Sequence, residues 1–376
     1  MVDLTSRSTD DGHPASIPET TAAPDDPLGY RRGRLRAWAW LAGLTLGLIG
    51  TVVIALGVGA AGIAPGTVAQ ILTHHLFGIP NEASWAGTDD AIIWNVRFPR
   101  AILGALVGAG LAVCGVVLQA MVRNVLADPY LLGINSGASS GAAAAILFGV
   151  GAGFGAYALP ASAFLGALAA SLLVFTLARS GGRVTSLRLL LSGVAVGYAL
   201  YATTSFLIFA SGSAEGARSV MFWLLGSLAL ANWDALLVVV SVVVVLCIAI
   251  TTLWGRRLDA LAIGDETAHT LGIAPERFRT ALLVVVSLCV GVLVSAAGSI
   301  GFVGLVVPHL ARRAVGATHV RAVPTAALMG AILLVWADVI ARVLLEPQEI
   351  PIGIITALLG APFLVVLIRR FQARDL

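Results

Sequence analysis

Two arginines, Arg97 and Arg100, stand three positions apart directly before a long apolar segment, and a third, Arg342, closes another such segment. Asp338 lies four residues before Arg342, so on a helix the two side chains would share a face and partly neutralise each other. Arginines gathered at one end of apolar helices could steer an acidic protein partner and fix its orientation, more than they add raw affinity. The simpler alternative is that Arg97 and Arg100 reach lipid phosphates.

The other reactive side chains predict no catalytic or metal site. All 23 basic residues are arginines, and without a lysine the chain cannot form the phosphate-binding loop of an ATPase. Cys114, Cys247 and Cys289 stand singly inside apolar segments, without metal-ligand spacing, and are expected to be small buried side chains. The six histidines show no ligand geometry either. An intramembrane hydrolase with Ser136 or Ser139 as nucleophile lacks a histidine placed deep enough to act as its base.

The elements that must position these side chains are membrane helices. The chain of 376 residues is 58% hydrophobic and 11% charged, whereas an ordinary soluble domain has roughly a quarter charged residues. Apolar segments near the length needed to cross about 30 Å of hydrocarbon recur throughout. The sequence therefore predicts an all-α polytopic membrane protein with about ten transmembrane helices. The expected spans are 37–59, 101–120, 131–150, 158–178, 187–210, 235–254, 280–297, 300–311, 325–345 and 352–368. The eighth is short and is expected to pack inside the bundle as a partial span.

The positions of the arginines give the orientation, because cytoplasmic connections are enriched in basic residues. With both termini in the cytoplasm, nineteen of the 23 arginines lie inside: Arg7, Arg31, Arg32, Arg34, Arg36, Arg123, Arg179, Arg183, Arg188, Arg256, Arg257, Arg277, Arg279, Arg312, Arg313, Arg321, Arg369, Arg370 and Arg374. Arg97, Arg100, Arg218 and Arg342 then lie outside. The first half of the bundle, made of spans two to five, begins outside, and the half made of spans seven to ten begins inside. This is the parity of an inverted-topology repeat, common among transporters.

Composition divides the chain into three parts. Residues 1–36 are expected to be a disordered cytoplasmic tail, because the stretch up to about residue 30 is rich in Pro, Asp, Ser and Thr. Residues 37–370 are expected to form a single transmembrane domain, and residues 371–376 a cytoplasmic C-terminal tail. The first apolar segment starts too late, and is too long, to be the core of a secretory signal.

Six motifs cover most of the chain from residue 95 onward: RFPRAILGALVGAGLAVCGVVLQAMVRNVLADPYLLGINSGASSGA (97–142), MFWLLGSL (221–228), IGDETAHTLGI (263–273), GFVGLVVPHLARR (301–313), WADVIAR (336–342) and EIPIGIITALLGAPF (349–363). In their order and spacing they closely resemble the permease subunits of bacterial ATP-binding-cassette (ABC) importers for iron chelates, haem and cobalamin. One departure is Val125, where the family usually has proline after Arg-Asn.

The resemblance implies roles for three groups of residues. A short coupling helix at about 264–272 would dock in a groove of a separate ATPase, through Gly264, Asp265, Glu266, Ala268, Leu271 and Gly272. Taken by themselves, Asp265 could cap this helix and Gly272 could end it. Asn124, Thr185 and Ser186 match the family's cytoplasmic gate, although they could equally be capping or turn residues. Arg97, Arg100 and Arg342 match positions that meet glutamates on the two lobes of a substrate-binding protein.

The expected function is therefore that of the permease subunit of an ATP-driven importer, located in the bacterial cell (inner or plasma) membrane as a multi-pass protein. Its expected partners are two ATPase subunits, which would hold ATP and magnesium, an extracytoplasmic substrate-binding protein, a second identical or homologous permease and the lipid bilayer. The chain itself is expected to have no catalytic residue, metal or cofactor, and no role with nucleic acid. A ferric siderophore is the favoured cargo, with cobalamin or haem as alternatives. An ion-driven secondary transporter is the remote alternative.

Overall fold

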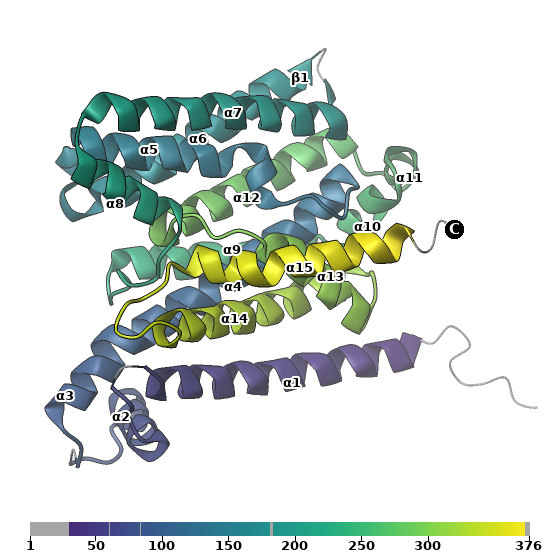
Figure 1. The fold of residues 1–376 in the computed structure, drawn as a ribbon. Helices are drawn as coiled ribbons and strands as arrows, with labels where there is room; N and C mark the ends of the chain where they lie inside the picture. The colour runs from purple at the N-terminus through teal and green to yellow at the C-terminus, as the bar shows by residue number, and fades with distance from the viewer. Residues whose placement is uncertain (1–29, 60, 83, 181–182, 373–376) are drawn as a thin grey trace, which may run out of the picture.

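The computed structural model describes residues 30–59, 61–82, 84–180 and 183–372. The described chain is almost entirely helical (Figure 1). Its α-helices are α1 (Tyr30–Gly57), α2 (Pro65–Phe77), α3 (Gly87–Asp90), α4 (Phe98–Val122), α5 (Ile134–Phe148), α6 (Ala158–Ala178), α7 (Ser186–Ser211), α8 (Ala214–Leu224), α9 (Ala235–Leu253), α10 (Gly255–Ile263), α11 (Asp265–Thr270), α12 (Pro275–Ala297), α13 (Val303–Val315), α14 (His319–Val343) and α15 (Ile352–Gln372). A π-helical turn, η1 (Ala91–Arg97), leads into α4, and η2 (Pro129–Leu132) and η3 (Ala152–Tyr157) are short 3-10 helices. Two antiparallel two-residue strands, β1 (Arg179–Ser180) and β2 (Arg183–Val184), connect α6 to α7.

A helix stands at each of the ten expected spans, so the predicted all-α membrane fold is confirmed. Within the described residues, seven helical stretches are long and apolar enough to cross a membrane: Gly33–Gly57, Gly87–Val122, Ala152–Ala178, Ser186–Ser211, Ala235–Leu253, Pro275–Ala297 and His319–Val343. Residues 352–367 of α15 form a shorter apolar helix. The remaining two are α5, with 15 residues, and α13, with 13. At about 1.5 Å per residue, α13 reaches only part of the way across, and its mostly buried side chains confirm a partial span packed inside the bundle.

The two ends of the bundle carry different elements. The first turn of α1, the last turn of α15 and the small helix α11 lie at one end, which we call the inner end (Figure 1). The helices α2, α3 and α8 lie at the opposite, outer end. The start of α1 and the end of α15 therefore lie on the same side of the bundle, as the arginine distribution predicts. That the inner end faces the cytoplasm, and that the halves form an inverted repeat, stay predictions.

Helix α4 lies at the centre of the bundle, and most of its residues are buried. Its backbone comes very close to those of two neighbouring helices. A Cβ placed on Gly108 would lie 2.1 Å from the carbonyl oxygen of Gly330 in α14, and one on Gly115 would lie 1.9 Å from that of Gly304 in α13. No larger residue fits at either crossing without moving a helix. Small residues at such crossings let helix backbones approach closely.

The domain boundaries from composition fall partly outside the described residues. Helix α1 begins at Tyr30, so residues 30–36, which composition assigned to the N-terminal tail, are helical. Residues 1–29 of that tail and residues 373–376 of the C-terminal tail lie outside the described chain. At the other end, α15 continues to Gln372, past the boundary drawn at residue 370.

Candidate functional site

Three of the outer-end arginines, Arg97, Arg100 and Arg342, have largely buried side chains that are bonded within the chain. Arg100, 8% exposed, donates from Nε to Asp338 Oδ1 at 2.9 Å and from Nη1 to both carboxylate oxygens of Glu349, at 2.9 and 3.1 Å. Asp338 also has its Oδ2 3.1 Å from Nε of Arg342, so the pair predicted from their four-residue spacing is confirmed. Two arginines thus share one buried carboxylate.

Arg97 and Arg342 close the end of α1. Arg342 donates from Nη1 to the carbonyl of Val58 and from Nη2 to that of Ala55, both at 3.1 Å. Arg97 donates to the carbonyls of Leu56 and Ala61, both at 2.7 Å. The last carbonyls of a helix lack partners within it, and cations there interact favourably with the helix dipole. These side chains therefore anchor α1 to α4 and α14.

Accessible charge at the outer end lies beside this cluster. A cavity of about 630 Å³ is bordered by Arg100, by Glu215 and Arg218 of α8, and by Glu349. The Glu349 side chain is 47% exposed, and Arg218 is exposed too. Sequence reasoning noticed Arg218 as a fourth outer arginine but gave it no role, and it missed Glu349. The predicted docking role of Arg97, Arg100 and Arg342 stays a prediction.

At the inner end, residues 264–272 do form a short helix, α11, although its first turn differs from expectation. Gly264 is the N-cap residue and no side chain caps the helix, so the expectation that Asp265 caps it is wrong. A buried arginine takes that carboxylate instead. Gly272 has a φ of 75° and ends the segment, as expected. Ala268 is fully buried, whereas Leu271 is 65% exposed, so the two do not share one environment. Glu266 is exposed.

The carboxylate of Asp265 is held by Arg279 of α12. Nη1 and Nη2 of Arg279 donate to Oδ2 and Oδ1 of Asp265 at 2.9 and 2.7 Å, a two-point contact between planar groups. Nη2 of Arg123 lies 3.9 Å from the same carboxylate. The hydrogen bonds from Arg279 lower the pKa of Asp265 below its usual value, so the carboxylate is ionised at neutral pH.

The three predicted gate residues gather where α4 ends and α7 begins. Ser186 donates its hydroxyl to the carbonyl of Met121, at 3.1 Å. Thr185 is the N-cap residue of α7 and accepts from the backbone nitrogen of Arg188 at 3.4 Å. Asn124 accepts from the backbone nitrogen of Leu126 at 2.9 Å, which shapes the turn after α4. Each has a local structural role, the alternative that the sequence left open, and the gate role stays a prediction.

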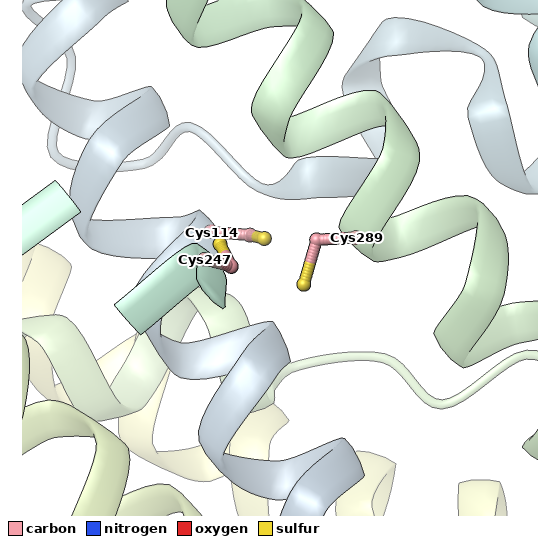
Figure 2. A group of neighbouring side chains, drawn as sticks. All are labelled: Cys114, Cys247 and Cys289. Carbon is pink, nitrogen blue, oxygen red and sulfur yellow. The ribbon is translucent and has the colours of Figure 1, made fainter. Parts of the chain in front are cut away.

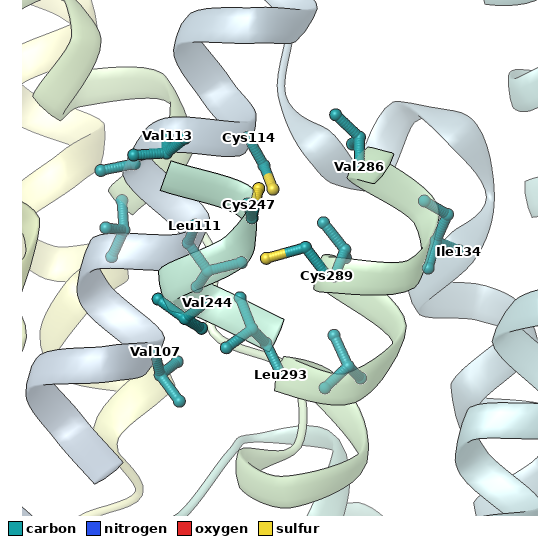
Figure 3. Packing of buried hydrophobic residues seen from close by; sticks show 14 of the residues in the cluster. Val107, Leu111, Val113, Cys114, Ile134, Val244, Cys247, Val286, Cys289 and Leu293 are labelled. Carbon is teal, nitrogen blue, oxygen red and sulfur yellow. The ribbon is translucent and has the colours of Figure 1, made fainter. Parts of the chain in front are cut away.

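The three cysteines are buried, as predicted, and they meet although they are far apart in sequence. Their sulfur atoms, from α4, α9 and α12, lie within 4.8 Å of one another and point into the same gap (Figure 2). Apolar side chains, among them Leu111, Val244 and Leu293, surround them (Figure 3). Buried cysteines with apolar neighbours typically act as small packing side chains. Packing is therefore their evident role.

The hydroxyl of Ser139, one of the two serines considered as a hydrolase nucleophile, donates to the carbonyl of Asn135 in its own helix at 2.8 Å. This is a common arrangement of serine inside membrane helices.

The comparisons with known proteins agree with this architecture. Residues 47–370 match the FecCD transport family. The cobalamin import system permease protein of Halobacterium salinarum is 43% identical over 300 residues, covering 80% of this chain and 78% of that protein. The hemin transport system permease protein of Yersinia pestis is 42% identical over 294 residues, covering 77% and 85%. A solved metal-chelate type ABC transporter, in an inward-facing conformation, superposes with a TM-score of 0.76 at 36% identity, covering 88% of this chain and 98% of that one.

A helical bundle of this kind, with charged groups at both ends and an apolar centre, is that of a multi-pass membrane protein. The chain belongs to the FecCD transport family and is an ABC importer permease.

Proposed function

We propose that this permease passes a ferric siderophore from an extracytoplasmic binding protein into the cytoplasm, across the bacterial cell membrane. Two separate ATPase subunits hydrolyse ATP, since this chain has no lysine for a phosphate-binding loop. A second permease subunit, identical or homologous, completes the translocation path. The observation that carries the proposal is the match to a metal-chelate transporter over 98% of that chain.

In the proposed cargo the metal ion is already held by the ligand atoms of the chelate. An iron chelate brings its own ligands, so the permease needs a passage rather than a metal site. The relatives named for cobalamin and hemin also concern large complexes with a chelated metal. Cobalamin and haem are therefore the second candidates for this chain.

The two ends of the bundle divide the work. At the inner end, α11 and the exposed Leu271 form the surface that docks in the ATPase. At the outer end, Arg97, Arg100 and Arg342 set the charge and shape of the surface that receives the binding protein. Because these three side chains are already bonded within the chain, the exposed Arg218 supplies the most accessible positive charge for the encounter.

Reconstitution in proteoliposomes tests the proposal. The permease is combined with its ATPase and its binding protein, and uptake of a radiolabelled ferric siderophore, cyanocobalamin and hemin is measured with ATP inside the vesicle or without it. Uptake of the siderophore that needs ATP and both partners supports the proposal. Uptake of only cobalamin or hemin reassigns the cargo. Uptake driven by a proton or sodium gradient, without ATP, would overturn the importer mechanism.

A further inference from the structure

One backbone carbonyl joins three helices at the inner end. The carbonyl of Met121 belongs to the last turn of α4 and has no partner within that helix. It accepts from the Ser186 hydroxyl of α7 at 3.1 Å and from Nε of Arg279 in α12 at 3.5 Å. A guanidinium at a helix C-terminus also interacts favourably with the helix dipole. The ends of α4, α7 and α12 thus share one polar contact.

Arg279 connects this carbonyl to α11. Its side chain is 2% exposed, and its Nη atoms hold Asp265 in the two-point contact. A buried guanidinium keeps both of its partners because an unpaired charge in this position is costly. Its planar, rigid group also fixes the direction of the carboxylate relative to the carbonyl. A displacement of Asp265 therefore has to move Arg279 or break the pair.

Helix α11 is suited to receive such a displacement. It has six residues, and it presents Glu266 and Leu271 to solvent. The Asp265 side chain is 42% exposed, so this end of the contact lies at the surface while the Arg279 end lies in the bundle. The other end of the chain of contacts, Ser186, stands beside Thr185 and close to the turn of Asn124.

We propose that Arg279 is a positioning residue that transmits movement of α11 to the inner ends of α4 and α7, along the path Asp265, Arg279, Met121 carbonyl and Ser186. The inference rests on the proposed function, in which α11 docks in the ATPase. Closing or tilting of α11 shifts the guanidinium against the Met121 carbonyl, and this sets the separation of the two helix ends that carry Asn124 and Thr185. If this path is broken, the ATPase still hydrolyses ATP, but the passage does not open.

The test compares Arg279→Lys with Arg277→Lys in the assembled transporter. Lysine at 279 keeps the charge but cannot hold Asp265 in two-point fashion while its side chain also meets the Met121 carbonyl. Arg277 is an exposed arginine on the same helix, two residues away, and is the matched control. We measure ATP hydrolysis, uptake and copurification of the ATPase. Expected for Arg279→Lys is ATPase binding as in the wild type and hydrolysis within about twofold, with uptake per ATP lowered about 10-fold, a typical size for coupling between sites.

A double-mutant cycle separates transmission from a general structural role. Asp265→Asn removes the charge from the other half of the pair but keeps one oxygen that can accept from Arg279, and copurification of the assembled transporter shows whether this variant folds. If the pair acts as one unit, the double variant is no more uncoupled than either single variant. Uptake and hydrolysis that fall together, additive effects, or normal uptake per ATP in Arg279→Lys each overturn the path. Loss of ATP dependence in the wild type would instead overturn the proposed function.

Discussion

The outer and inner ends of the bundle both contain an arginine that binds the last carbonyls of a helix, but the contact has a different role at each end. At the outer end, Arg97 and Arg342 close α1, and Asp338, the carboxylate partner of Arg342 and Arg100, is buried in α14. At the inner end, Arg279 meets the last turn of α4, but its carboxylate partner Asp265 sits on a separate small helix.

The position of the carboxylate decides what the contact can do. When acid and base belong to the same packed helices, the group is an anchor that holds the helices in register. When the acid belongs to a short surface element, the same chemistry becomes a link between that element and the core. We therefore expect disruption of the outer group to reduce stability first, and disruption of the inner group to reduce coupling first.

The largest effect is expected from Asp338→Asn. Asp338 is 3% exposed and contacts both Arg100 and Arg342, so its loss leaves two buried cations short of a partner. Breaking a buried ion pair from one side typically costs about 3–5 kcal/mol. Urea unfolding in detergent, followed by tryptophan fluorescence, measures the loss in the free energy of unfolding.

The matched control is Glu349→Gln, whose carboxylate also binds Arg100 but is about half exposed. For a pair of this kind we expect a loss of about 1 kcal/mol or less. Equal losses in the two variants would show that burial does not distinguish the acids, and that the outer group is not an anchor centred on Asp338.

The next effect concerns the inner end. Leu271→Asp places a charge on the surface that α11 presents, where the side chain is 65% exposed in the isolated chain. The fold is expected to be unchanged, and the affinity for the ATPase to fall about 30-fold, the size of a hot-spot residue at an interface. Binding of the purified ATPase to the permease in nanodiscs measures this.

Leu344→Asp serves as the control, because Leu344 is a leucine of similar exposure that follows α14 at the outer end. It should leave ATPase binding unaltered. If Leu271→Asp also binds the ATPase normally and supports full uptake, α11 is not the docking element. The inner end then does not link the ATPase to the core of the bundle.

A smaller effect is expected at the outer surface from Arg218→Glu. An exposed charge at the rim of an interface changes mainly the association rate, by up to about 10-fold at low salt, and the difference should shrink as salt screens it. Stopped-flow binding of the binding protein at two ionic strengths measures the rate, with Arg218→Lys as the control. An unchanged rate would exclude Arg218 from docking.

Reversal of both Arg97 and Arg100 to Glu is expected to abolish binding-protein-dependent uptake and also to lower the free energy of unfolding. Both arginines are buried, so the reversal would also place carboxylates against helix carbonyls and Asp338. Unfolding has to be measured alongside uptake for this variant. Normal uptake would contradict the docking role.

The features predicted correctly from the sequence are those that depend on local spacing or on long apolar segments. The ten helices and the Asp338–Arg342 pair follow from these, because a helix fixes which residues share a face. The bond between Arg100 and Glu349 joins residues 249 positions apart and depends on how α4 meets the segment before α15. Asp265 looked like a capping residue because capping is local, whereas Arg279 reaches it only once α11 folds back on α12. Tertiary contacts of this kind leave no periodic signal.

The smallest effect is expected midway between the two ends, where the cysteines meet. Their neighbours are apolar and their thiols are buried, so removal of each sulfur should affect only local packing. A single substitution such as Cys289→Ala is expected to cost about 1 kcal/mol or less, from a small cavity, and the cysteine-free triple alanine variant should transport within about twofold of the wild type, since no step at either end depends on it. Maleimide labelling of the folded wild type, compared with the protein in denaturant, gives the complementary measurement, because a thiol enclosed by helices reacts only after unfolding. Rapid labelling of the folded protein, or inhibition of uptake by a mercurial that spares the cysteine-free variant, would show that the centre opens during transport and carries more than packing.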